Sequence, residues 1–182
     1  MTLLSHNELV RLVKAGVIDG VTPGAINASS IDIHLGQNII MEKKPENSLM
    51  GMIDYRERES FTHIEHNMQE YGWMVLPGEF ILAQSMERFN LPNDISAEYK
   101  LKSSMARIGL EHMNAGWCDA GWNGSVLTLE FKNMLQHHSI RIRPGDAIGQ
   151  MIFFRHEPVS AEASYAARGR YNNDKSVKGI KL

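Results

Sequence analysis

The N-terminal residues have the apolar pattern of an amphipathic helix. Apolar residues fill four of the five positions at 9–13, and Ser5 precedes them with Glu8 three positions further on, the spacing of a capping box. Gly16 suits the end of this helix because glycine readily adopts the left-handed conformation found there. A second, short helix is predicted for residues 104–108.

Most of the remaining chain predicts short strands. Apolar and polar residues alternate through 31–35, the period of a strand with one buried face. Three further apolar runs, each preceded by turn-forming residues, lie at 80–84, 126–131 and 148–154. Short strands separated by turns predict a mainly β domain, built as a β-barrel or a jelly-roll-like sheet and spanning residues 1–182.

Two polar segments interrupt this pattern. Residues 43–72 carry few strong strand signals, so we expect an insertion or a loop there rather than a second domain. The segment 161–182 is polar and basic, which is typical of a frayed terminus or of a flap that orders over a ligand. Because this tail offers little to bury, we expect it to become ordered only with a partner such as a phosphate group.

Composition narrows the class of protein. The chain has 182 residues, a formal net charge of -2 and one cysteine, Cys118. It therefore lacks the basic surface charge of a nucleic-acid binder, and it has neither a disulfide framework nor a cysteine-built zinc site. The first residues lack the apolar region of a signal peptide, and no apolar run approaches the ~18 residues of a membrane span. We expect a cytoplasmic protein with no nucleic-acid or membrane partner.

Hydroxyls and cations gather at the start of the predicted central helix. Ser103 and Ser104 are flanked by Lys102 and Arg107. Two hydroxyls at a helix start are commonly caps. A helix start with cations on both sides is also a natural anion site, and the sequence favours neither interpretation.

A glycine-rich run follows at 115–124. Its three glycines permit close approach of a ligand, or they form an ordinary hairpin. Asp119 is a candidate ligand-binding carboxylate or an Asx-turn residue. Trp117 and Trp122 offer flat faces to a base or sugar, or they belong to the core.

Glu130 stands in an apolar strand. Leu127, Leu129 and Phe131 share one face of that strand, and Glu130 shares the other with Thr128. This pattern alone favours a solvent-facing glutamate. A buried glutamate would instead be a candidate proton carrier.

Metal-binding motifs are incomplete in this chain. His63-Ile64-Glu65 matches the first half of the zinc-deaminase signature, but the cysteine pair of its second half is missing. A His-Glu-x-x-His motif, a phosphate-binding Walker loop and a nucleophile elbow are also missing. We expect no protein-bound metal and no zinc.

Read in order, these motifs resemble the dCTP deaminase branch of the dUTPase-like superfamily. The resemblance includes Lys102-Ser103-Ser104-Met105-Ala106-Arg107 and Asp119-Ala120-Gly121-Trp122-Asn123-Gly124. It continues through residues 29–36, 76–80, 91–95, 112–115, 129–133, 143–145 and 148–150. It implies a distorted β-barrel or jelly-roll-like fold with an N-terminal and a short central helix. It also implies a homotrimer with active sites between subunits and a deoxyribonucleoside triphosphate substrate that carries Mg²⁺.

The resemblance also assigns roles to residues. Glu130 would take a proton from the water that attacks C4 of cytosine, while Ser103, Arg107 and the Ala115 carbonyl hold the water and the carboxylate. The substrate contacts it implies are Lys102, Ser104, Met113, Asn114, Asp119, Trp122, Tyr165, Arg170, Tyr171 and Asp174. Asp174 replaces a glutamine that helps to read the base in this family, which points to a modified cytosine or another base.

Two other functions compete with cytosine deamination. The run 116–124 also resembles the uracil hairpin of dUTPases, in which the residue at Asp119 activates water against the α-phosphorus. This predicts a nucleotide pyrophosphatase, or a bifunctional enzyme that deaminates and then cleaves. The other competing function is a nucleotide-binding regulatory trimer without catalysis. The joint presence of Ser103, Arg107 and Glu130 argues against it.

Overall fold

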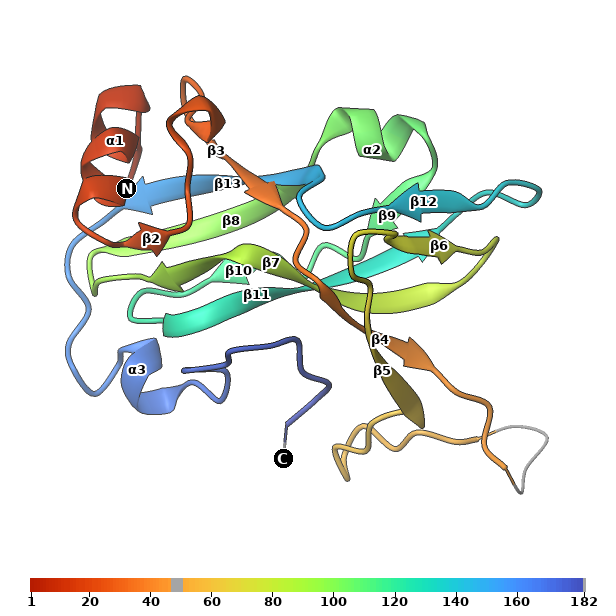
Figure 1. Ribbon diagram of the computed structural model, residues 1–182. Coiled ribbons are helices and arrows are strands. Elements are labelled where there is room, and N and C mark those ends of the chain that lie inside the picture. Colours follow the sequence, from red (N-terminus) through yellow and green to blue (C-terminus); the bar gives the residue numbers. More distant parts are fainter. Residues whose placement is uncertain (47–50, 182) are drawn as a thin grey trace.

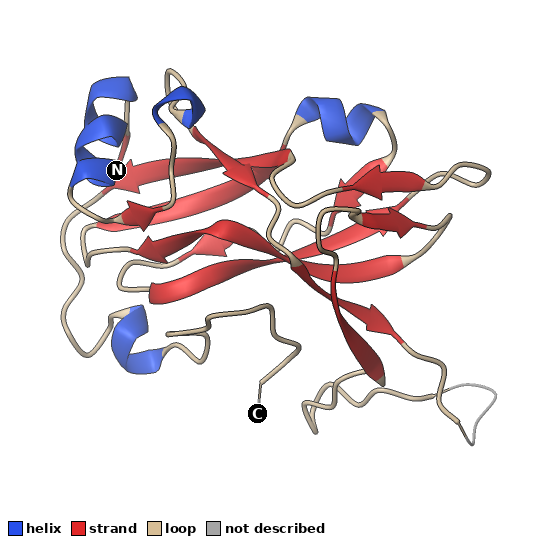
Figure 2. Ribbon diagram, in the orientation of Figure 1, coloured by secondary structure: helices blue, strands red, loops and turns tan. Residues whose placement is uncertain are grey.

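A computed structural model describes residues 1–46 and 51–181 of the chain, and Figure 2 shows that strands dominate it. The helices are α1 (His6–Lys14), η1 (Pro23–Ala25, a 3₁₀ turn), α2 (Ser103–Arg107) and α3 (Tyr165–Arg168). The strands are β1 (Thr2–Leu3), β2 (Ile18–Asp19), β3 (Ile31–His34), β4 (Asn38–Glu42), β5 (His63–Asn67), β6 (Trp73–Val75), β7 (Phe80–Asn90), β8 (Ile95–Leu101), β9 (Leu110–His112), β10 (Trp117–Cys118), β11 (Asn123–Asn133), β12 (Ile140–Ile142) and β13 (Ala147–Arg155).

Two larger sheets and one small ladder form the body of the protein. One sheet has the order β1-β13-β8-β10, with β3 also paired to β13. The other has the order β5-β4-β7-β11-β9, with β2 also paired to β7, and β12 pairs with β6. The core is built from buried side chains of both larger sheets, including Phe89, Leu129, Phe131 and Phe153. A mainly β fold is confirmed, and the described strands form separate ladders rather than one closed barrel.

The elements with the clearest sequence signals are confirmed. Helix α1 begins directly after Ser5, whose backbone N–H donates to the Glu8 carboxylate at 3.4 Å, and Gly16 follows it with a φ of 73°. Helix α2 starts at Ser103, one residue before the predicted start. The four predicted strands are β3, β7, β11 and β13, and the last three extend beyond the predicted runs.

The polar segment 43–72 contains more regular structure than its composition predicts. Its prediction as a loop is wrong for β5, which pairs antiparallel with β4 and places Glu65 opposite Ile40. All five residues of β5 are exposed, so no apolar face marks this strand in the sequence. Residues 47–50 of this segment lie outside the described part of the chain.

Helix α2 and the C-terminal tail lie on opposite sides of the molecule. In Figure 1, α2 stands above the sheets, while α3 and the chain that follows it run beneath β11. No helix in the described part of the chain is long and apolar enough to cross a membrane.

Candidate active site

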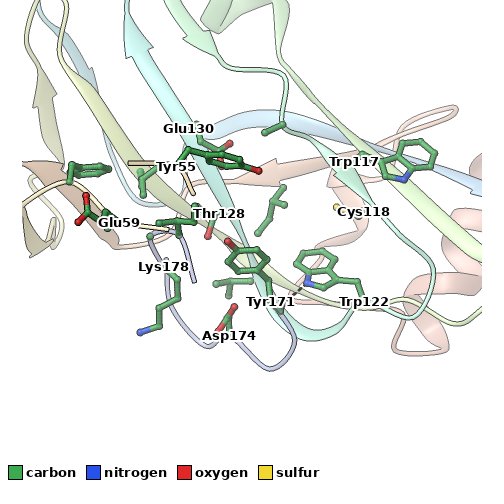
Figure 3. Close-up of a pocket in the computed structure, with 18 of the residues that line it drawn as sticks. Tyr55, Glu59, Trp117, Cys118, Trp122, Thr128, Glu130, Tyr171, Asp174 and Lys178 are labelled. Carbon is green, nitrogen blue, oxygen red and sulfur yellow. Dashed lines mark hydrogen bonds between the residues drawn. The ribbon is translucent and has the colours of Figure 1, made fainter. Parts of the chain in front are cut away.

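A cavity of about 540 Å³ opens on the face of β11 that carries Glu130 (Figure 3). Its floor comes from β11, one wall from the β10–β11 hairpin, and its cover from the β4–β5 loop and the C-terminal tail. The side chains that line it are mainly apolar and aromatic, with few charged groups among them. Such a cavity, with a few polar groups directed into it, is the usual form of a small-molecule site.

Glu130 lies in this cavity and not on a solvated face. Its side chain is 25% exposed, and it shares its side of the strand with Thr128 and the buried Val126. The preference for a solvent-facing glutamate is therefore wrong, because the tail and the β4–β5 loop cover this face. A carboxylate in mainly apolar surroundings is suited to hold and release a proton.

Trp122 belongs to the core and also fixes the tail. It is 6% exposed and stacks on Phe89 with ring centroids 5.2 Å apart. Its indole N–H donates to the carbonyl of Tyr171 at 2.8 Å, and one edge of the ring lines the cavity. Core packing is therefore confirmed for Trp122, and its contact with a ligand stays a prediction.

The glycine-rich hairpin is shaped to receive the tail. A Cβ atom on Gly121 would collide with Ser164, and one on Gly124 would collide with Asn173. Both glycines also have positive φ values, of 87° and 67°. These two glycines therefore permit close approach of the C-terminal segment of the same chain.

Hydrogen bonds from the backbone and from the Ser125 hydroxyl hold the tail beside β11. The Val126 N–H donates to the Asp174 carbonyl at 2.9 Å, and the Asp174 N–H donates to Ser125 Oγ at 3.0 Å. Ser125 Oγ in turn donates to the Tyr171 carbonyl at 2.8 Å. The tail therefore lies as an irregular segment along the N-terminal half of β11.

A small apolar cluster links the tail to the β4–β5 loop. Val177 is 4% exposed and groups with Ile40 of β4 and Leu82 of β7, and Phe61 packs against them. The expectation that the tail has little to bury is wrong at Val177, whose partners come from three distant segments. The tail and the β4–β5 loop consequently cover the cavity together.

Asp174 has an ion-pair partner within the tail. Lys181 Nζ donates to both of its carboxylate oxygens, at 2.6 Å and 2.8 Å, and lies 5.3 Å from the centre of the Tyr171 ring. Both carboxylate oxygens of Asp174 therefore accept hydrogen bonds from within the tail. This arrangement weakens the sequence argument that an aspartate alone reads the base.

The predicted site residues fall into two separate groups. The cavity brings together Ala115, Trp122, Glu130, Tyr165, Tyr171 and Asp174. Ser103, Ser104 and Arg107 are exposed on α2 and do not line it. Met113, Asn114, Asp119 and Arg170 are exposed and also lie outside the lining, and the Asp119 carboxylate accepts a hydrogen bond from the Trp117 indole at 2.8 Å.

Lys102 is bound within its own chain. Its Nζ lies 2.6 Å from an Asp32 carboxylate oxygen, whose partner oxygen accepts from Asn27 at 2.8 Å. Burial alone would raise the pKa of Asp32, but the hydrogen bonds from Lys102 and Asn27 and the charge of Lys102 outweigh it and lower that pKa. The ion pair links the start of α2 to β3.

Several cavity residues carry no signal that sequence analysis recognised. Tyr55, Glu59 and Phe61 come from the segment interpreted as an insertion, and Lys178 comes from the tail. Thr128 could have been found, because it follows from Glu130 by the period of two in β11. The other four depend on long-range folding of polar segments.

The described residues contain no cluster of three or more His, Cys, Asp or Glu side chains placed to hold a metal ion. The features that define the site are an apolar, aromatic cavity with one carboxylate on its floor and a separate helix start bearing hydroxyls and a cation. This combination is typical of a mainly β enzyme that acts on a small molecule, and hydroxyls beside a cation suit the phosphates of a nucleotide.

Comparison with known proteins specifies the family. A family model described as dCTP deaminase-like matches residues 3–156. The chain is 35% identical over 161 residues to a "dCTP deaminase, dUMP-forming" of Methanospirillum hungatei, covering 88% of this chain and 84% of that protein. It is 32% identical to a protein of the same name from Persephonella marina, covering 99% of this chain and 97% of the other. The chain belongs to the dCTP deaminase-like family.

A solved structure supports the fold. The crystal structure of 2'-deoxycytidine 5'-triphosphate deaminase from Agrobacterium tumefaciens superposes with a TM-score of 0.64 at 21% identity. The match covers 85% of this chain and 48% of that chain, so the present chain spans about half the length of that relative. The fold predicted from the resemblance is confirmed.

Proposed function

We propose that the protein deaminates dCTP and releases dUMP, ammonia and pyrophosphate. The observation that carries this proposal is Glu130, a carboxylate on the floor of a mainly apolar cavity large enough for a nucleoside. Relatives that match over most of the chain are named dCTP deaminases that form dUMP, which supports the same reaction. A cytoplasmic location is part of the proposal.

In the proposed deamination, Glu130 takes a proton from a water molecule, and the hydroxide attacks C4 of the cytosine ring. Ala115 lines the same cavity, and its carbonyl is the proposed acceptor for the second hydrogen of that water. The aromatic walls formed by Tyr171 and Trp122 suit a flat base and its sugar. The apolar surroundings strengthen each polar contact made inside.

The proposed dUMP product requires a second hydrolysis. One water replaces the amino group at C4, and another attacks the α-phosphorus so that pyrophosphate leaves. This second step adds a pyrophosphatase activity to the deaminase. It corresponds to the bifunctional enzyme that was one of the alternatives from the sequence. Asp119 is a candidate for the second water because its carboxylate is exposed next to the cavity wall at Cys118.

The proposed active form is a homotrimer in which each site joins two chains. Within one chain, Ser103 and Arg107 lie on α2, on the other side of the sheets from the tail that covers Glu130. A second copy would bring its α2 to the first copy's cavity and supply hydroxyls and a cation for the triphosphate. Exposed apolar side chains such as Ile108 and Met113 near α2 suit such a contact.

Separate assays of ammonia and pyrophosphate test the function. The purified protein should release both from dCTP and only pyrophosphate from dUTP. Ammonia without pyrophosphate would limit the protein to deamination. Pyrophosphate from dUTP with no ammonia from dCTP would make it a dUTPase-type enzyme, and binding without either product would make it a regulatory protein.

Activity should survive treatment with a zinc chelator, because we expect no metal ion to be bound by the protein itself. We propose that Mg²⁺ arrives with the triphosphate and that no zinc is bound, because the chain has one cysteine, which is buried in the cavity wall. Dialysis against a zinc chelator followed by added Mg²⁺ should leave full activity. One zinc per chain by elemental analysis, with activity lost on its removal, would contradict this.

Removal of the tail should abolish turnover without unfolding the sheets. Truncation before Ala166 removes Tyr171, Asp174 and Lys178 from the cavity, and the two larger sheets contain none of the deleted residues. We expect less than about 1% of the wild-type kcat and a retained cooperative thermal transition. Glu162→Gln, an exposed change before the tail reaches the cavity, is the matched control and should remain active. Full activity after truncation would contradict a covering role for the tail.

A further inference from the structure

Glu130 and two other residues, His112 and Tyr99, each have a buried polar atom without a hydrogen-bond partner within the described residues. The atoms are Glu130 Oε2, His112 Nε2 and the Tyr99 hydroxyl. His112 and Tyr99 are 3% and 2% exposed. Buried polar atoms are normally hydrogen-bonded, so a group of three around a proposed proton carrier calls for a functional explanation.

The fold fixes His112 beside Glu130. His112 ends β9 and lies opposite Phe131, the neighbour of Glu130 in β11. Its Nε2 is 3.3 Å from Glu130 Oε2, although the two atoms are not aligned as a hydrogen bond. The imidazole packs between the rings of Tyr99 and Phe131, with centroid distances of 4.6 Å and 5.8 Å. A small rotation of the carboxylate or the imidazole would therefore align them.

The two oxygens of Glu130 have different surroundings. Oε2 is buried toward His112, whereas the side chain as a whole is 25% exposed and lines the cavity. The accessible oxygen is consequently Oε1. Only this oxygen is placed to meet a water molecule in the cavity.

We propose that His112 is a positioning residue that donates its Nε2–H to Glu130 Oε2, so that Oε1 alone carries the proton in deamination. This inference rests on the proposed function. Oε1 takes a proton from water while the water oxygen bonds to C4, and then passes that proton to N3. The proton of the new C4 hydroxyl next moves through Oε1 to the amino group, and the C4–N4 bond breaks as ammonia leaves. His112 keeps its Nε2 proton throughout.

Tyr99 and Cys118, two ionisable neighbours of this pair, stay protonated. Burial raises the pKa of Tyr99, and the charges of Glu130 and Glu87 raise it further. Burial likewise raises the pKa of the Cys118 thiol, and the charges of Asp119 and Glu130 add to this. Tyr99 from β8 and Cys118 from β10 therefore bring no negative charge to the carboxylate.

Two substitutions at one position test the proposal. Phenylalanine at position 112 keeps the ring packing and removes the donor, so His112→Phe should lower kcat by about tenfold or more with KM nearly unchanged. The side-chain amide nitrogen of glutamine can occupy the Nε2 position, so His112→Gln should recover kcat to within roughly fivefold of the wild type. Thermal unfolding of each variant controls for loss of structure.

The contrast between these two variants separates positioning from simple packing. Equal kcat defects in His112→Phe and His112→Gln would overturn the proposal, as would wild-type kcat in His112→Phe.

An experiment without turnover tests the tautomer. In protein with ¹⁵N-labelled histidine, the imidazole signals that vanish in His112→Gln belong to His112. They should show a proton on Nε2, and a proton on Nδ1 with bare Nε2 would overturn the proposal. Absence of ammonia release from the wild type would instead refute the proposed function. The tautomer measurement does not depend on turnover, so it would still show whether His112 can donate to Glu130.

Discussion

Glu130→Gln should lose roughly 100-fold or more of its ammonia release, because glutamine keeps the shape of the side chain but cannot accept and return a proton. The change lies on the cavity floor, where Glu130 Oε2 has no hydrogen-bond partner within the described residues, so the thermal transition should stay close to that of the wild type. Ammonia release under saturating dCTP is the measurement.

A matched control comes from β5. Glu65 also occupies a strand but is exposed and lies outside the cavity, so Glu65→Gln should leave ammonia release unchanged. Near wild-type ammonia release from Glu130→Gln would remove Glu130 from the mechanism. An unfolded Glu130→Gln would show that the carboxylate has a structural role instead.

Activity should reappear when two inactive variants assemble together. Glu130→Gln lacks the proton carrier of the cavity half, and Arg107→Gln lacks a cation of the α2 half. If each site joins the cavity of one chain to α2 of another, every mixed trimer has both intact halves at about one in three of its sites. Co-expression with two different tags, purification on both and an ammonia assay would measure this recovery.

The control for this experiment uses two defects in one half. Glu130→Gln mixed with Glu130→Ala should remain inactive, because every cavity half is impaired. Light scattering should report a trimer for each preparation. A monomer, or an inactive mixture of folded Glu130→Gln and Arg107→Gln chains, would contradict a site shared between copies.

The parts of the fold that follow local rules could be predicted from the sequence. The capping box at Ser5 and Glu8 marked α1, and turn residues before apolar runs marked β7, β11 and β13. Strand β5 gave no such signal, because all five of its residues are exposed and its ladder partner, β4, lies far back along the chain. Periodicity reports a buried face, so it fails where a strand has none.

The candidate site was predictable in its residue types but not in its surroundings. Motif order identified Glu130, Ala115 and Tyr171, which do meet in the cavity. The side of β11 that carries Glu130 could not be assigned, because its cover comes from the β4–β5 loop and the C-terminal tail, both distant from Glu130 along the chain. Val177 illustrates the reason, since a single valine in a polar tail acquires its importance only from partners such as Leu82.

The cluster of Val177, Leu82 and Phe61 also has an evolutionary consequence. Phe61 belongs to the loop that precedes β5 and Val177 to the tail, and Ser60 and Gly179 lie against each other beside them. A substitution in one segment that changes its volume leaves a gap or a clash in the other. The loop and the tail are therefore expected to diverge as one unit, and a chimera that inherits its tail from a relative should need the relative's loop as well.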